Sequence, residues 1–208
     1  LNMSGYNIGN FSMPFAQGFL GPTGVVATSL FDLGNAIICL GGSYSLASMS
    51  AKGKKKISLL PMVKTLFQSI PFDIYLFMTL LSLLHWNLPG PVLTFAGIVG
   101  NANAFLAMLM VGVGFQLSGD REQIGKIAKI ILVRYSVALL LCLVFFFCLP
   151  LGLEYRQALA ILVFSPISSA ATAFTAELKG DYGLSSAVNS VSIVVSIALM
   201  TITLLVVL

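Results

Sequence analysis

Long runs of mostly apolar residues dominate this sequence, and each run is about as long as a lipid bilayer is thick. A helix that crosses a bilayer needs about 20 such residues in a row. Runs of this kind cover residues 23–48, 66–87, 92–117, 127–149, 157–177 and 186–208. Only 9% of the residues are charged, whereas a soluble domain usually carries about 25%. A soluble fold could not hide so much apolar surface from water, so the sequence predicts an all-α polytopic membrane protein.

Residues 1–20 form most of one further span, which brings the expected number of spans to about seven. Short segments rich in Gly, Pro or charge separate the spans, and they are GPT at 21–23, NLPGP at 87–91, SGDREQIGK at 118–126, LPLGLEYR at 149–156 and ELKGDYG at 177–183. The 3 cysteines, Cys39, Cys142 and Cys148, lie inside apolar runs. We interpret them as small packing side chains.

The basic residues indicate how these spans are oriented. If seven spans alternate across the bilayer, every one of the 11 Lys and Arg residues except Arg156 falls on the same side. The positive-inside rule makes that side cytoplasmic, which places the C-terminus outside the cytoplasm and favours the plasma membrane. The net charge of +4 is therefore a topology feature. It does not predict nucleic-acid binding, since the basic residues do not gather on one soluble face.

Two of the expected spans contain a proline among polar residues. The first is NIGNFSMPFAQGFLG, from Asn7 to Gly21, with Pro14 near its middle. The second is LVFSPISSAATAF, from Leu162 to Phe174, with Pro166. A proline inside a helix removes a backbone hydrogen bond and clashes with the preceding turn. At membrane depth the freed backbone groups are tolerated only when they are buried in protein or face a wet cavity.

Taken singly, either proline is equally well explained by an ordinary kink, but the two stand in matching places. Each interrupted span is followed by a Gly-bearing turn and a helix with a polar residue near its middle. The first pair starts inside and the second outside, so the two pairs are inverted. Paired, interrupted and inverted helices indicate a secondary-transporter site at the membrane midplane. The N-termini of half-helices there offer partial positive charge to an anion.

This pattern predicts an inverted-repeat organisation. Residues 66–208 form a complete five-span repeat, residues 51–65 a basic cytoplasmic loop, and residues 1–50 the last two spans of a truncated first repeat. A symmetric repeat then predicts three more spans before Leu1, or about 90 residues, and a parent protein of ten spans.

At the level of these motifs the chain resembles the auxin efflux carrier family of membrane permeases. The resemblance rests on NIGNFSMPFAQGFLG followed by GVVATSLFDLGN, and continues through NANAFLAMLMVGVGFQL and LVFSPISSAATAFTAELKGDYGLSSAVNSVSIVVS. It implies ten helices in two inverted repeats, with two proline-broken helices crossing at the substrate site. It also implies organic-anion substrates such as auxin, malate or malonate, and an architecture shared with bile acid/sodium symporters. This sequence has NANAF without the proline that the family often carries there.

Asp32 is the candidate for ion coupling. It lies roughly 15 Å into its span at about 1.5 Å per residue, where an ionisable group is costly and indicates function. Asn35 lies on the same helical face. Asp32 would bind a coupling proton or Na⁺, and the alternative is a structural carboxyl group hydrogen-bonded inside the bundle. No other cofactor is expected.

The candidate substrate-binding residues are polar side chains and prolines near the interruptions or in mid-span. They are Asn7, Asn10, Pro14, Asn35, Asn101, Asn103, Ser165, Pro166, Ser168, Ser169 and Asn189. Their amides and hydroxyls can donate to a carboxylate. The alternative roles are capping of helix ends and hydrogen bonds between helices. No basic residue is expected deep in a span, so amides, hydroxyls and helix ends would hold an anion.

Together these features predict a secondary-active transporter of small organic anions, with carboxylates favoured, that works by alternating access. Enzyme motifs, phosphate loops and metal-ligand spacings are absent from the sequence. The expected partners are the substrate and the lipid bilayer, and a homodimer stays open. The rival predictions are a non-transporting sensor or assembly subunit, and a channel, for which the stripe at residues 185–196 would supply polar lining.

Overall fold

The computed structural model describes residues 1–44, 46–47, 63, 67, 70–113 and 121–207. Within those residues the protein is helical apart from its connecting segments. The helices are η1 (Ile8–Ser12), α1 (Met13–Phe19), α2 (Gly21–Ala36), η2 (Ile37–Ser43), α5 (Ile70–Leu83), α6 (Gly90–Val113), α7 (Arg121–Cys148), α8 (Leu153–Leu162), α9 (Ser169–Glu177) and α10 (Tyr182–Val207). Extended backbone pairing in this part of the chain is confined to an isolated antiparallel bridge between Tyr6 and Ile167.

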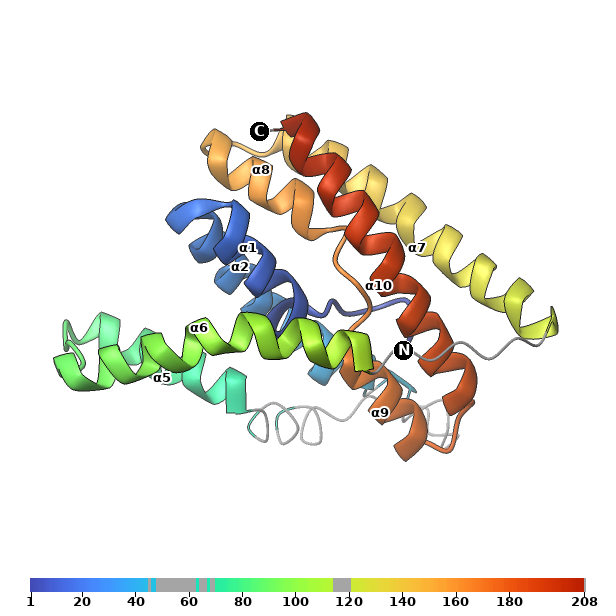
Figure 1. The fold of residues 1–208 in the computed structure, drawn as a ribbon, viewed down its shortest axis with the longest axis horizontal. Coiled ribbons are helices and arrows are strands. Elements are labelled where there is room, and N and C mark those ends of the chain that lie inside the picture. Colours follow the sequence, from blue (N-terminus) through green and yellow to red (C-terminus); the bar gives the residue numbers. More distant parts are fainter. Residues whose placement is uncertain (45, 48–62, 64–66, 68–69, 114–120, 208) are drawn as a thin grey trace.

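The C-terminal helices form an up-down-up bundle. Figure 1 shows α7 and α10 running in the same direction, while α8 and α9 together run the opposite way. Helix α8 packs against both α7 and α10, and α9 packs against α10. The buried face of α10 combines small and apolar side chains, among them Ala187, Ser192 and Met200, and small residues let helices approach closely in a membrane.

The N-terminal helices pack onto this bundle as a hairpin. Helices α1 and α2 pack against each other, and α2 packs against α8. The reversal between them uses Gly21, which has a φ of 64° that favours glycine. Pro22 then lies in the first turn of α2, where its missing N–H costs nothing.

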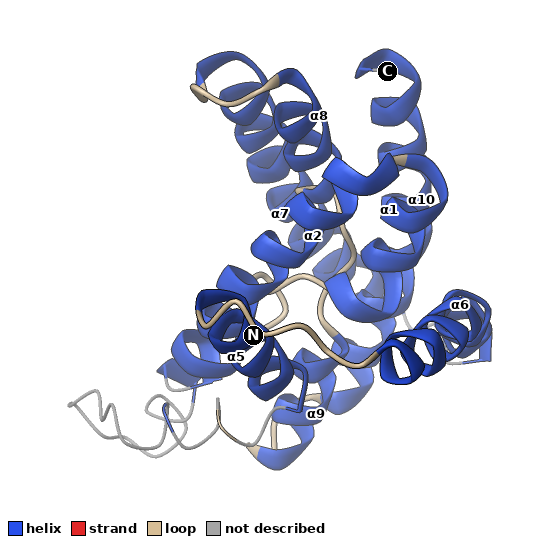
Figure 2. Cartoon of the chain, turned by 90° about the vertical axis from the view of Figure 1, so that its left-hand side faces the viewer, coloured by secondary structure: helices blue, strands red, loops and turns tan. Residues whose placement is uncertain are grey.

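Helices α5 and α6 lie apart from the bundle. Figures 1 and 2 both show α6 crossing beside the other helices. Helix α6 packs against η1 and α1. Its residues from Pro91 to Val99 are all exposed, and Phe95 keeps 70% of its surface exposed. Such an apolar surface suits lipid or another apolar partner.

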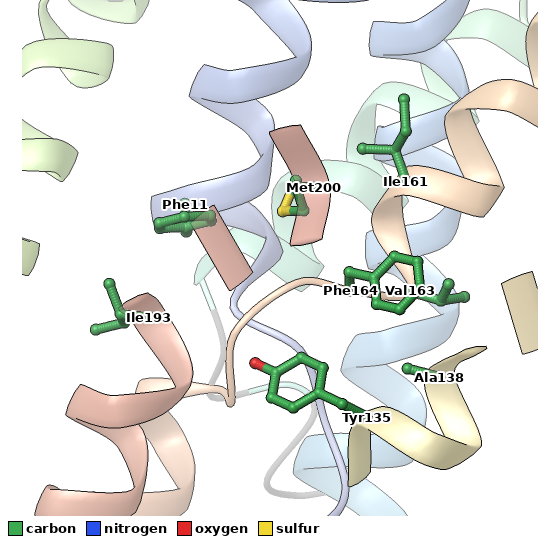
Figure 3. Close-up of a cluster of buried hydrophobic side chains, with 8 residues drawn as sticks. All are labelled: Phe11, Tyr135, Ala138, Ile161, Val163, Phe164, Ile193 and Met200. Atoms are coloured by element: carbon green, nitrogen blue, oxygen red, sulfur yellow. The ribbon is translucent and has the colours of Figure 1, made fainter. Parts of the chain in front are cut away.

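The main buried cluster joins segments that are far apart in the sequence. Figure 3 shows Phe11 of η1, Tyr135 and Ala138 of α7, Ile161 of α8, Val163 and Phe164 after α8, and Ile193 and Met200 of α10. Phe11 is 1% exposed and Met200 is 0% exposed. Close packing of these side chains holds η1 against α10.

Among the residues that the structure describes, three helical segments are long and apolar enough to cross a membrane, namely Gly21–Cys39, Glu122–Cys148 and Tyr182–Val207. They confirm the expectation of a helical protein with helices of membrane-spanning length and composition, within the described residues. The full count of seven spans stays a prediction.

The two proline-bearing spans behave differently. The second is interrupted at Pro166 as predicted, since α8 ends at Leu162 and α9 begins at Ser169. The prediction of a break around Pro14 is wrong in its position, because a continuous helical segment runs from Ile8 to Phe19.

A π turn explains how Pro14 fits inside this helix. The N–H of Met13 donates to the carbonyl of Ile8, and that of Ser12 donates to the carbonyl of Asn7 at 3.3 Å. In a regular α-helix the proline ring would clash with the carbonyl of Asn10, and the wider π turn accommodates it. The non-helical part of the opening stretch is therefore the segment before Ile8.

Candidate functional site

Two non-helical segments meet where the N-terminal hairpin joins the bundle. We call the place where residues 1–7 meet residues 163–168 the crossing. The segments pair through the Tyr6–Ile167 bridge, and the N–H of Asn7 donates to the carbonyl of Pro166 at 2.8 Å. Helix η1 begins directly after the first segment and α9 directly after the second. The crossing therefore brings two helix N-termini, which carry partial positive charge, close to each other.

A side-chain bond ties the start of the first helix to the second segment. The hydroxyl of Ser12 donates to that of Ser165 at 2.6 Å, and the hydroxyl of Ser165 donates to the carbonyl of Leu162 at 2.5 Å. Both serines are 0% exposed. Ser165 is therefore occupied by structural bonds and not turned toward an open cavity.

Arg134 on α7 holds both segments of the crossing. It is 6% exposed. Its guanidinium donates to backbone carbonyl oxygens on both sides, at 3.0 Å to Met3 and Gly5, 3.2 Å to Ser165 and 3.5 Å to Pro166. These contacts supply donors to carbonyls that have no helical partner.

The position of Arg134 corrects one prediction from the sequence. We expected no basic residue deep in a span, and counted Arg134 with the cytoplasmic charges. In the structure it is buried in the middle part of α7, with its guanidinium 4.7 Å from the centre of the Tyr6 ring. This distance allows a cation–π contact. A fixed positive charge is thus present at the crossing, beside amides and hydroxyls.

Asn35 on α2 locks the first segment from the opposite side. Its Oδ1 accepts from the N–H of Tyr6 at 2.8 Å, and its Nδ2 donates to the carbonyl of Tyr6 at 2.9 Å. This two-way pairing replaces the bonds that a neighbouring strand would make. Asn35 was predicted as a substrate residue, and its recorded bonds give it a structural role.

Asp32 is buried close to Asn35 and Tyr6, in agreement with its predicted position deep in the span. It is 9% exposed, and its Oδ1 accepts from Nδ2 of Asn35 at 3.3 Å. Its Oδ2 lies 3.9 Å from the point that a Cβ on Gly9 would occupy. The carboxyl group therefore lies beside the first turn of η1, where a negative charge is favourable.

The polar stripe on α10 faces the crossing. Ser192 accepts from the N–H of Ile167 at 3.1 Å, and Ser196 lies 2.7 Å from the hydroxyl of Tyr135. Ser185 donates to Oδ1 of Asn2 at 2.7 Å. These three serines are 0% exposed, so they act in packing between helices.

Asn189 belongs to the same stripe but differs from the serines. The residue is half-buried. Its Oδ1 is buried and has no hydrogen-bond donor among the described residues. The Nε of Arg134 is buried in the same way, without an acceptor in that part of the chain. Such buried polar atoms are uncommon in native proteins and call for an explanation.

The remaining predicted residues divide into three groups. Asn7 is buried and Pro14 is buried, while Asn10 is exposed. Ser168 caps α9 by accepting from the N–H of Ala170 at 3.3 Å, and Ser169 is half-buried. Asn101 and Asn103 fall on α6 at positions whose side chains lie outside the described part of the structure. Residues 51–62 of the basic loop also lie outside the described residues.

A groove opens beside the crossing, along α2. It has a volume of about 240 Å³. Its walls are Gly5, Tyr6, Leu30, Phe31, Gly34, Asn35 and Ile38. Apolar side chains dominate these walls, and Asn35 supplies the polar group that joins the groove to the crossing.

The site contains no metal centre of the usual kind in the part described. Among those residues, no group of three or more His, Cys, Asp or Glu side chains could hold a metal ion. The chemistry that the crossing offers is therefore that of backbone amides, carbonyls, hydroxyls, one guanidinium and one carboxyl group. This set suits the binding of an ion or a small polar ligand.

Sequence reasoning missed Arg134, Tyr6 and Ser12 as members of the site. For Arg134 a clue was available, since it lies well inside the expected span 127–149, where a charge is costly. Tyr6 acts through its backbone and ring, and Ser12 through a partner distant in sequence, so no local pattern indicated either one.

Comparisons of this chain with protein family models, with curated proteins and with solved structures find no match.

Proposed function

We propose that this protein is a secondary-active membrane transporter of small organic anions, carboxylates in particular, which works by alternating access. The observation that carries the proposal is the crossing, where the non-helical segment before η1 pairs with the interruption between α8 and α9 beside a buried arginine. Interrupted helices that meet inside a membrane bundle are the usual place for substrate and coupling ions in such transporters.

The charges at the crossing support an anionic substrate. The N-termini of η1 and α9 lie next to the paired segments, and each contributes partial positive charge. Arg134 adds a full positive charge, and its Nε–H has no acceptor among the described residues. A carboxylate oxygen is a strong acceptor for such a donor. Anions therefore fit this site better than cations do.

The arrangement of the helices supports movement of one body against another. Hydrogen bonds join α7 to both segments through Arg134 and join α7 to α10 through Tyr135. The hairpin of α5 and α6 stands beside this unit (Figure 1) and packs against η1 and α1 through α6. In our proposal the hydrogen-bonded unit moves relative to this hairpin, as in rocking mechanisms of alternating access.

Asp32 is the proposed coupling residue. It is buried next to the first turn of η1 and bonded to Asn35, which in turn holds Tyr6 of the crossing. Protonation of the carboxyl group would weaken the contact with the helix N-terminus. A proton is thus able to influence the position of the first segment.

The test is uptake by purified full-length protein in proteoliposomes. A panel of labelled mono- and dicarboxylates is offered with an imposed proton gradient, sodium gradient or membrane potential. We expect saturable uptake of at least one acid, and loss of the gradient dependence in Asp32→Asn. Glu154→Gln is the matched control, because Glu154 is an exposed carboxyl group on α8 and should leave uptake unchanged.

Each rival function gives a different result. Folded protein without uptake of any carboxylate would contradict the proposal and favour a sensor or assembly subunit. Flux that rises without saturation, together with single-channel currents, would favour a channel. Saturable uptake with gradient dependence intact in Asp32→Asn would support the transporter but assign Asp32 a structural role.

A further inference from the structure

Carbonyl oxygens from two distant segments converge on one cation at the crossing. The guanidinium of Arg134 donates hydrogen bonds to four backbone carbonyl oxygens. Two belong to Met3 and Gly5 in the first segment, and two to Ser165 and Pro166 in the second. A cluster of backbone carbonyls on non-helical segments is the ligand set that binds Na⁺ in many inverted-repeat transporters. Here the guanidinium of Arg134, on α7, occupies the centre of that set of carbonyls.

A positive group stabilises these carbonyls, although that of Pro166 also accepts from the N–H of Asn7. Ser165 and Pro166 follow the last residue of α8, where the helix carries partial negative charge. Inside a bilayer, backbone groups without a partner are costly, since water is absent. A guanidinium balances the partial negative charge at the end of α8 and also donates hydrogen bonds to the carbonyl oxygens. Arginine stays protonated under all ordinary conditions.

We propose that Arg134 is a tethered cation that does the work of a bound metal cation at the crossing, so that assembly of the crossing and transport through it do not require Na⁺. The inference rests on the proposed transport function for its transport part and on the fold alone for its stability part. In this role Arg134 acts through the two segments that its Nη1 and Nη2 atoms join, and the contact of its Nε–H with a substrate carboxylate is a separate role.

The ring of Tyr6 completes the environment of this charge. It lies 4.7 Å from the guanidinium carbon, and its backbone is held by Asn35 on the other side. A bound Na⁺ would leave the backbone carbonyls without a cation when it dissociates. The side chain of Arg134 stays attached to α7 and keeps its contacts with them. The pairing of the two segments therefore does not depend on whether Na⁺ is present.

The first test measures melting temperatures of the full chain in detergent, in equal concentrations of sodium chloride and choline chloride. We expect the same melting temperature for the wild type in both salts. The variants are Arg134→Lys, which keeps the charge, and Arg134→Gln, which keeps an amide donor without charge. Arg134→Gln should melt roughly 10 °C lower, and Arg134→Lys should retain part of the lost stability.

Lys129→Gln is the matched control, because Lys129 is an exposed basic residue on the same helix and its loss should leave the melting temperature unchanged. Stabilisation of the wild type by sodium over choline would overturn the proposal. So would an Arg134→Gln protein that is as stable as Arg134→Lys, since charge would then be unimportant. If Arg134→Gln does not fold while Arg134→Lys does, the requirement for charge is supported.

The second test is uptake by the wild type with sodium replaced by choline on both sides of the proteoliposome. Unchanged uptake supports the tethered cation, and uptake that stops without sodium overturns it while leaving the transporter proposal intact. Absence of uptake in both salts would contradict the proposed function, and the melting experiment would still decide the role of Arg134.

Discussion

Gly5 shows how tightly the crossing restricts single residues. Its φ is +82°, and a Cβ placed there would lie 2.5 Å from the Sγ of Cys39. The left-handed backbone costs an L-residue about 1–2 kcal/mol, and overpacking adds roughly 1–3 kcal/mol. We therefore expect Gly5→Ala to lower the free energy of unfolding by about 2–5 kcal/mol, measured by denaturant unfolding in detergent.

Gly21→Ala separates the two causes in this prediction. Gly21 also has a positive φ, of +64°, but a Cβ there would meet no atom within 4 Å. Its loss should cost only the backbone part, about 1–2 kcal/mol. Replacing Cys39 with Ala in the Gly5→Ala protein should recover part of the stability. Equal effects of Gly5→Ala and Gly21→Ala would show that the contact with Cys39 is unimportant.

At the scale of elements, Ser12 and Ser165 join two segments that no local pattern connects. Their hydroxyls are 2.6 Å apart and fully buried. Each single change to Ala removes this bond but leaves the other hydroxyl a backbone acceptor, Asn7 for Ser12 and Leu162 for Ser165, so each should cost about 1 kcal/mol. The double variant should cost less than the sum of the single ones by about 1 kcal/mol, as measured by unfolding in detergent.

Thr94 provides the comparison for this double-mutant cycle. Its hydroxyl donates to the carbonyl of Gly90 within its own helix, α6. The effects of Thr94→Ala and Ser165→Ala should therefore add. Additive effects for Ser12 and Ser165 as well would mean that the two hydroxyls do not stabilise the crossing together.

The elements also show which features a sequence reveals. The apolar runs at 127–149 and 186–208 correspond to α7 and α10, because helical packing is governed by local apolar pattern. The interruption at Pro166 was predicted, since proline acts on its own preceding turn. The start of the first helix at Ile8 was not predicted. The π turn that accommodates Pro14 depends on which N–H groups donate to the carbonyls of Asn7 and Ile8, and the sequence does not reveal this.

Arg134 illustrates what sequence reasoning could not predict about the site. The positive-inside rule counts charges by side and not by depth, so it gave this residue a cytoplasmic place. Its partners are carbonyl oxygens of Gly5 and Ser165, and every residue type has such an oxygen. Contacts with backbone atoms far away in the sequence leave no pattern in residue identity.

At the scale of the whole molecule, the directions of the helices predict which helix ends face the same side of the membrane. Figure 1 shows α7 and α10 starting at one end of the bundle, while the turn from α7 to α8 lies at the other. Lys179 lies just before α10, and Glu154 lies in the first turn of α8. Both residues are exposed, so the two positions should face opposite sides.

Labelling of single cysteines tests this orientation. In a background with Cys39, Cys142 and Cys148 changed to Ala, Lys179→Cys and Glu154→Cys are treated with an impermeant maleimide on intact cells. The charge bias predicts a cytoplasmic position for Lys179. We therefore expect labelling of Glu154→Cys on intact cells, and of Lys179→Cys only after permeabilisation. The reverse result would invert the topology, and labelling of both on intact cells would show that α8 and α9 together do not cross the membrane.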